Sequence, residues 1–257
     1  MAQQKAFIAM PSHDGLPKMA TLFSLVQFIT EANANGLLWE LKTWIGDSIV
    51  ASARNVMAGA FLQSDCTDMV FIDSDVSWEI GALTRLLSHP VDMVAGVYRT
   101  KKDEQERYPV RFLDPSNIEQ RDDGLIETET VPLGFSRITR SALHKMVRHY
   151  DYLNYDCEMA PGVPLWCLFD NELKDRKYWG EDFVFCKRWR AIGGQIYVDP
   201  ELHLGHTGMK QFDGHLGEWL RKNTLNKPDK EVTEKLANLV ASPEFAKLLA
   251  AAEGKAA

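Results

Sequence analysis

MVFIDSDVSWE, Met69 to Glu79, joins four apolar residues to two aspartates that are separated by a single serine. An apolar run that ends abruptly in polar residues is typical of a buried strand leaving the core. The carboxylates of Asp73 and Asp75 lie on so short a turn that they repel each other unless a positive charge is near them. The stretch therefore predicts a buried strand whose exit carries a cation site.

Apolar runs and helical patterns alternate around this strand. We expect strands over 5–11, 37–45, 68–73 and 91–99, and helices over 18–36, 48–64 and 79–90. Apolar strands that alternate with helices indicate a mainly parallel sheet covered on both faces. In such sheets ligands bind beyond the carboxyl ends of the strands, which is where Asp73 and Asp75 are expected.

The second half of the chain has a different pattern. The expected elements are antiparallel strands over 108–114 and 124–138, helices over 139–150 and 181–194, and a last strand over 195–199. We therefore expect an α/β fold with a small antiparallel portion. Its main domain would span residues 1–222, followed by a helical C-terminal extension over 223–257.

Composition limits the classes of function. The net charge of −7 argues against general nucleic-acid binding, which usually uses a basic surface. No apolar run reaches the roughly 18 residues of a membrane span, and the N-terminus lacks a signal-peptide pattern. The four cysteines lack the close C-x-x-C spacing of a zinc site, so free thiols and a cytoplasmic location are expected.

Carboxylate oxygens suit Mn²⁺ or Mg²⁺, which proteins commonly hold by one or two carboxylates together with substrate phosphates. FIDSDV (71–76) also fits, letter by letter, the nucleophile motif of haloacid-dehalogenase-type phosphatases. That family usually opens its core domain with this strand, whereas here three elements come first. A nucleotidyltransferase uses a related sheet, but PSHDGLPK (11–18) is a poor version of its Gly-rich basic loop.

Three longer stretches resemble, in order, a family 2-like nucleotide-sugar-dependent glycosyltransferase of the GT-A fold. They are SARNVMAGAFLQSDCTDMVFIDSDVSW (52–78), VPLGFSRITRSALHKM (131–146) and YWGEDFVFCKRWRAIGGQIYVDPELHLGHTG (178–208). The first gives an Arg-Asn helix and the Asp-x-Asp motif, the second a Gly-containing segment, and the third a Glu-Asp helix and a terminal His. The resemblance covers about residues 5 to 210.

The resemblance implies a role for individual residues. Asp73, Asp75 and His206 would hold Mn²⁺ or Mg²⁺ against the donor diphosphate, with Asp75 as the firmer ligand. Asp182, or less readily Glu181, would be the catalytic base, although acids in a first helical turn are also favoured by the helix dipole alone. The expected nucleotide-sugar-binding residues are Pro11, Ser12, His13, Asp47, Arg54, Asn55, Ser74 and Trp179.

The predicted function is sugar transfer from a nucleoside diphosphate sugar to an acceptor hydroxyl, with inversion favoured over retention. The phosphatase, the nucleotidyltransferase and a non-catalytic sugar-nucleotide-binding protein stay open as alternatives. The acceptor is open between a glycan, a lipid-linked sugar, a protein and a modified nucleic-acid base. The charged run from Lys101 to Arg107 predicts a solvated loop or a mobile lid over the donor.

Overall fold

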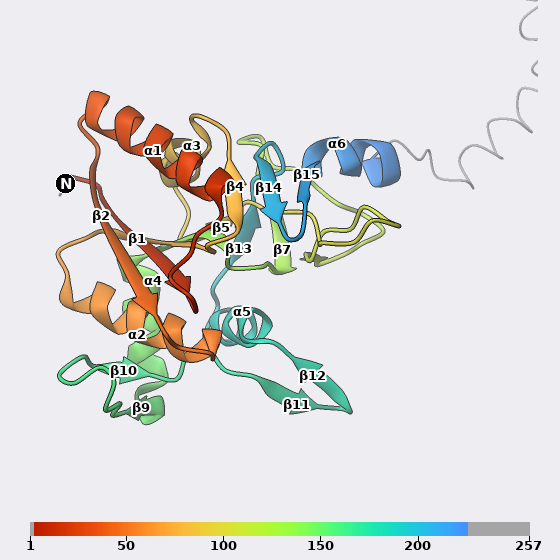
Figure 1. Cartoon of the computed structure of the whole chain (residues 1–257). Helices are drawn as coiled ribbons and strands as arrows, with labels where there is room; N and C mark the ends of the chain where they lie inside the picture. The colour runs from red at the N-terminus through yellow and green to blue at the C-terminus, as the bar shows by residue number, and fades with distance from the viewer. Residues whose placement is uncertain (1–2, 226–257) are drawn as a thin grey trace, which may run out of the picture. The chain divides into compact units, whose positions relative to one another are not determined.

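The computed structural model describes residues 3–225 (Figure 1). The chain divides into two compact units, Met1–Glu218 and Trp219–Ala257. The helical extension predicted for 223–257 lies outside the described residues from 226 onward. The fold and the candidate site below belong to the first unit.

An eight-stranded sheet forms the centre of this unit, in the order β2-β1-β3-β8-β5-β13-β7-β6. Its strands are β1 (Lys5–Ser12), β2 (Leu38–Ile45), β3 (Asp68–Ile72), β5 (Met93–Ala95), β6 (Arg111–Phe112), β7 (Ile126–Thr130), β8 (Phe135–Thr139) and β13 (Ile196–Val198). β1 pairs in parallel with β2 and β3, and β5 pairs in parallel with β13. The predicted α/β class with a mostly parallel sheet is confirmed.

β8 runs antiparallel to both of its neighbours, β3 and β5. The sequence predicted antiparallel strands in this region but did not predict that they enter the central sheet, where β6, β7 and β8 all lie. The strand expected over 91–99 is shorter than predicted, because only Met93–Ala95 pair with β8. The chain leaves the sheet after Ala95, and a hydrogen bond from the Thr100 N–H to the Arg107 carbonyl closes a loop at 2.8 Å.

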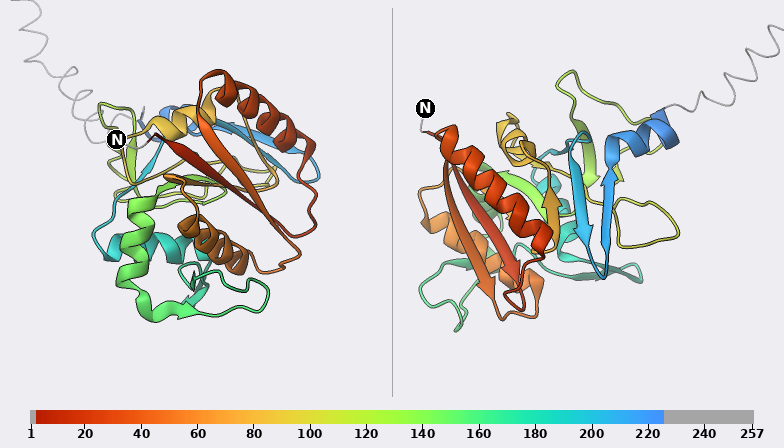
Figure 2. Two further views of the ribbon diagram at one scale, coloured as in Figure 1. Left: turned by 90° about the vertical axis from the view of Figure 1, so that its left-hand side faces the viewer. Right: turned by 45° about the horizontal axis from the view of Figure 1, so that its top comes forward.

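Helices cover both faces of the sheet (Figures 1 and 2). One face carries α1 (Met19–Ala34) and α3 (Ala82–Ser88), and the other carries α2 (Val50–Gln63), α4 (Arg140–His149) and α5 (Glu181–Ala191). α4 begins where predicted, because the Thr139 hydroxyl accepts the Ala142 N–H at 3.2 Å, as expected of an N-cap. α1 ends before Gly36, which has a φ of 67°, a backbone conformation that glycine adopts without strain.

Three smaller sheets complete the unit. They are β4 (Val76–Trp78) with β14 (His203–Thr207) and β15 (Gln211–His215), β9 (Asn154–Tyr155) with β10 (Leu165–Trp166), and β11 (Glu172–Lys174) with β12 (Lys177–Trp179). A 3₁₀ turn (Asp151–Leu153) precedes β9, and α6 (Leu216–Leu220) and a π-helical turn (Arg221–Leu225) follow β15. The prediction that 195–199 is the last strand is wrong, since β14 and β15 follow it. Their sequences, HLGHT and QFDGH, contain few of the apolar residues on which strand prediction depends.

Candidate functional site

The turn between β3 and β4 carries Asp73, Ser74 and Asp75 at the carboxyl end of β3. The Asp73 N–H donates to the carbonyl of Gly134 at 2.9 Å, and the Lys18 N–H donates to the carbonyl of Ser74 at 2.8 Å. The turn is therefore fixed to the segment before β8 and to the start of α1. The buried strand and its polar exit lie where the sequence predicted them.

Arg54 joins this turn to the start of α5. Its side chain is only 2% exposed, with Nη2 3.0 Å from Asp73 Oδ1 and Nε 3.4 Å from Glu181 Oε1 and 3.8 Å from Asp182 Oδ1. Burial lowers the pKa of Arg54, but the three carboxylates outweigh burial and raise that pKa above its ordinary value. The guanidinium thus stays charged and brings Asp73, Glu181 and Asp182 to one place.

Asp182 has a pKa far above the ordinary value of an aspartate. Burial raises the pKa of Asp182 to about 8; Arg54 opposes this rise, while Glu181 and Asp73 add to it. Its Oδ1 has no hydrogen-bond partner among the described residues. A carboxyl group with this pKa exchanges its proton near neutral pH, which is the property required of a catalytic base.

His206 reaches Asp75 because β14 pairs antiparallel with β4, opposite Val76. Its Nδ1 lies 2.9 Å from the carbonyl of Arg99, and its Nε2 lies 3.6 Å from Asp75 Oδ1. Since a carbonyl can only accept, Nδ1 carries the proton and Nε2 presents its lone pair toward Asp75. Burial lowers the pKa of His206, which keeps the ring neutral.

A divalent cation fits Asp75 and His206. One carboxylate oxygen faces an imidazole nitrogen whose partner nitrogen is fixed by a carbonyl, the usual arrangement of a metal-binding histidine. Asp73 does not join them, because its Oδ1 bonds to Arg54 and its Oδ2 lies 3.3 Å from the hydroxyl of Tyr98. The structure therefore brings together two of the three predicted ligands, Asp75 and His206. The ammonium of Lys101 also pairs with Asp75.

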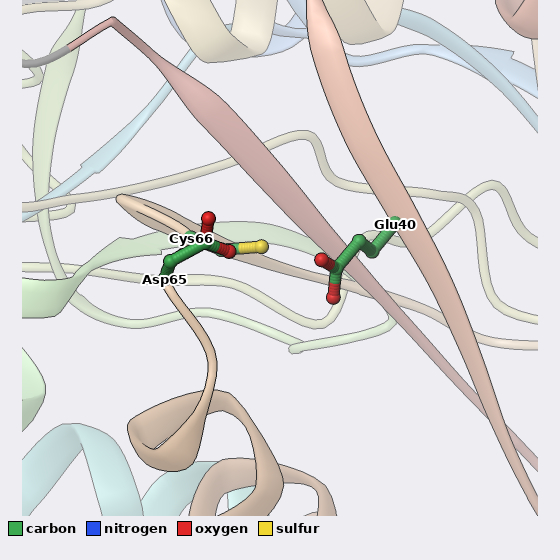
Figure 3. Close-up of side chains that lie close together, drawn as sticks. All are labelled: Glu40, Asp65 and Cys66. Carbon is green, nitrogen blue, oxygen red and sulfur yellow. The ribbon is translucent and has the colours of Figure 1, made fainter.

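Another group of potential ligands lies elsewhere. Glu40, Asp65 and Cys66 have ligating atoms within 4.8 Å of one another, and Figure 3 shows their side chains converging. The ammonium of Lys5 lies 2.5 Å from both carboxylates. Because Asp65 and Cys66 precede β3 whereas Asp73 and Asp75 follow it, this group lies at the opposite end of the strand from the Asp-x-Asp turn, and we assign no ion to it.

The predicted donor-binding residues of the first two strands lie at the same edge of the sheet as Asp73. Pro11 and Ser12 end β1, and the hydroxyl of Ser12 lies 3.3 Å from Asp14 Oδ1. The side chain of His13 is exposed, and its carbonyl accepts a backbone N–H. Burial opposes ionisation of Asp47, but hydrogen bonds from the Ser52 hydroxyl and a backbone N–H lower its pKa overall.

Asn55 has a different environment from Arg54. Its amide donates to the carbonyl of Phe169 at 2.8 Å and accepts the Phe169 N–H at 3.0 Å. The side chain is buried. In this structure Asn55 therefore fixes the segment at Phe169 to α2, and its amide is not turned toward the cluster around Arg54.

Trp179, at the end of β12, lines a pocket of about 390 Å³ together with Phe183 and Thr130. The guanidinium of Arg111 lies 4.4 Å from the centre of the Trp179 ring. Phe183 follows Asp182 directly in α5. The structure thus places a pocket with two aromatic rings and several charged side chains beside the helical turn that carries the candidate base.

Tyr98, Gly134 and Lys101 contact the Asp-x-Asp turn, although no sequence pattern predicted them as site residues. A Cβ atom on Gly134 would lie 2.2 Å from Asp73 Oδ2 and 2.4 Å from the Tyr98 hydroxyl oxygen, so any larger residue would displace these two side chains. Gly134 belongs to one of the stretches that resemble the glycosyltransferase family, and this resemblance was the one sequence feature that pointed to the residue. Lys101 stands in a charged run, where nothing distinguishes it from its neighbours.

No family model and no curated protein matches this chain. Among solved structures, A197 from STIV is 18% identical with a TM-score of 0.47, over 80% of this chain and 86% of that one. A mutant of Drosophila β1,4-galactosyltransferase 7, in complex with manganese, UDP-Gal and xylobiose, is 14% identical with a TM-score of 0.44, over 90% and 79%. S. aureus TarS (residues 1–349) is 15% identical with a TM-score of 0.42, over 76% and 58%. At these values the similarities assign neither a family nor a reaction to the chain.

Among the residues that the structure describes, no helix has both the length and the apolar character needed to cross a membrane.

Proposed function

We propose that the protein is a glycosyltransferase that moves a sugar from a nucleoside diphosphate sugar to an acceptor hydroxyl. One observation carries the proposal: buried Arg54 contacts the Asp-x-Asp turn and the Glu-Asp start of α5 at once. The Asp-x-Asp turn, which carries the proposed ligand Asp75, and the candidate base Asp182 are therefore joined through one guanidinium. The order of motifs along residues 5 to 210 supports the same function.

Mn²⁺ or Mg²⁺ would be held by Asp75 and His206, which fit it by distance and by the state of the imidazole. When bound, such an ion stabilises the diphosphate as it leaves with the electrons of the broken bond. Asp73 would act differently, by holding Arg54 in place between the cation site and α5.

Asp182 would be the base. The acceptor oxygen attacks the anomeric carbon, the bond between that carbon and the diphosphate oxygen breaks, and the acceptor proton passes to Asp182. A single displacement of this kind inverts the anomeric centre. Asp182 is ionised above about pH 8, so the proposed base is in its proton-accepting form on the alkaline side of that value.

The pocket at Trp179 supports a polar acceptor such as a sugar. Its lining combines the rings of Trp179 and Phe183, over which the guanidinium of Arg111 lies, with several charged side chains. The buried hydroxyl of Thr130 has no hydrogen-bond partner among the described residues, and Phe183 is the neighbour of Asp182. In the same proposal the reaction takes place within residues 1–222. The four free cysteines of the described chain favour the reducing conditions of the cytoplasm.

No specific observation favours the alternative reactions. A phosphatase of the haloacid-dehalogenase type would use Asp73 as a nucleophile, and both oxygens of Asp73 already contact Arg54 or Tyr98. Products separate the alternatives: a glycosyltransferase releases a nucleoside diphosphate, a phosphatase releases phosphate, and a nucleotidyltransferase releases pyrophosphate.

The test is a thermal-shift screen of nucleoside diphosphate sugars with and without Mn²⁺. A donor at 100 times its Kd adds about 2.7 kcal/mol to the free energy of unfolding, which for a domain of this size raises Tm by about 5–10 °C. We expect one donor to do so only with Mn²⁺, and the Asp75→Asn variant to lose the shift. The control is Asp122→Asn, which makes the same change at an exposed turn residue. If no donor shifts Tm, or if Asp75→Asn keeps the full shift, the proposed function is wrong.

A further inference from the structure

Lys101 occupies the cation site at Asp75. Its ammonium pairs with Asp75 Oδ2, while the other oxygen of the same carboxylate, Oδ1, faces His206 Nε2 at 3.6 Å. The side chains of Lys101 and Asp75 are 33% and 27% exposed, so the pair is partly shielded from water. A positive charge therefore already lies on the carboxylate that a divalent cation would use.

Backbone groups of neighbouring segments surround the side chain of Lys101 and its loop. A Cβ atom on Gly208 would lie 3.1 Å from Lys101 Cδ, so the aliphatic stem passes directly over the glycine. The loop is closed by the hydrogen bond from Thr100 to Arg107. The carbonyl of Arg99, two residues before Lys101, is the group that fixes His206. The loop thus touches both proposed ligands, Asp75 through a side chain and His206 through a carbonyl.

We propose that Lys101 is a built-in counter-cation that a divalent ion displaces from Asp75. Two cations on one carboxylate repel each other, so binding of the ion drives the ammonium away. The released ammonium stays on a loop next to the site and becomes available to the phosphate oxygens of the donor. The inference rests on the Asp75 and His206 ligands of the proposed function, and it does not depend on sugar transfer.

The experiment measures Mn²⁺ affinity of the full chain without any donor, from the electron paramagnetic resonance signal of free Mn²⁺. The variants are Lys101→Met and, as a control, Lys102→Met, which removes the same charge from an exposed position of the same loop. Because a partly exposed ion pair contributes up to about 1 kcal/mol, Lys101→Met should bind Mn²⁺ about three- to fivefold more tightly than the wild type. Lys102→Met should differ by less than about 1.5-fold at physiological salt, where distant surface charge is screened.

Equal or weaker Mn²⁺ affinity in Lys101→Met overturns the inference, as does an equal gain in Lys102→Met, which would reflect general charge. Absence of Mn²⁺ binding in both the wild type and Lys101→Met overturns it as well. The outcome is separate from the proposed function. Tighter Mn²⁺ binding by Lys101→Met in a protein that transfers no sugar supports the inference and contradicts the function. If the wild type turns over a donor and Lys101→Met has unchanged Mn²⁺ affinity, the proposed function is supported and the inference is contradicted.

Discussion

Replacing Arg54 by methionine removes the positive charge at the centre of the site while keeping most of the buried volume. Three carboxylates, at 3.0, 3.4 and 3.8 Å from the guanidinium nitrogens, lose their common partner. Breaking a buried ion pair from one side costs about 3–5 kcal/mol of unfolding free energy, because the remaining charge is left without compensation. For a domain of this size that corresponds to a Tm lower by about 6–20 °C.

The loss should depend on pH. The folded-state pKa of Asp182 is raised to about 8 from an ordinary value of 3.8, so its stabilising proton is bound at low pH and is lost as pH rises through 8. Arg54 lowers the pKa of Asp182, so removal of Arg54 raises this pKa further. The variant therefore keeps the Asp182 proton at pH values at which the wild type releases it. The variant should therefore be closest to the wild type near pH 5.5 and furthest from it near pH 8.5.

Urea unfolding followed by tryptophan fluorescence at these two pH values measures both effects. The control is Lys187→Met, also on α5, which breaks the exposed pair with Glu172 at 2.6 Å and should cost less than about 1 kcal/mol. A loss below about 1 kcal/mol for Arg54→Met would contradict the buried cluster. So would an equal loss at both pH values.

Four further outcomes follow from the site and the fold. Gly134→Ala should lower Tm and abolish donor binding, because its Cβ would overlap the Asp-x-Asp carboxylate at 2.2 Å; an unchanged Tm contradicts this. If Asp182 is the base, kcat/KM should fall as pH drops below about 8, and Glu181→Gln should move that fall to lower pH by removing a neighbouring negative charge. A pH-independent rate would exclude this assignment. Asn55→Ala should cost about 1–3 kcal/mol in urea unfolding, since it leaves buried backbone groups unpaired; a stable variant with weakened donor binding would instead favour the predicted ligand role. Thr139→Ala should cost about 1 kcal/mol through loss of the α4 N-cap, and no loss of helix stability would show that the cap is dispensable.

The local parts of the fold were predictable from the sequence. Residues 69–72 are apolar without interruption and end at Asp73, so both the strand and its exit are marked by adjacent residues. Both ends of α5 are marked in the same way. Acidic residues stand in its first turn, and Gly193 follows its end. These signals depend on neighbours in the chain, which a single sequence displays.

The contacts that assemble the candidate site join residues that are far apart in the sequence. Arg54 lies on a helix where an exposed arginine is the default, whereas in the fold it is buried and contacts Glu181, more than a hundred residues later. His206 reaches Asp75 through the pairing of β14 with β4, two strands with no strong pattern of their own. The sequence displays each of these residues, but their partners are fixed only by how the strands pair.

The antiparallel insertion of β8 also constrains the order in which the chain can fold. β3 is fully buried, with four apolar residues after Asp68, and one of its edges is covered only when Met69 pairs with Ile138. During synthesis this edge stays open until the ribosome has released most of the first unit, and open apolar edges invite pairing with other chains. Closing so long a loop is slow. We therefore expect nascent chains shorter than about 140 residues to need chaperone protection, even though the first three strands of the sheet are already complete.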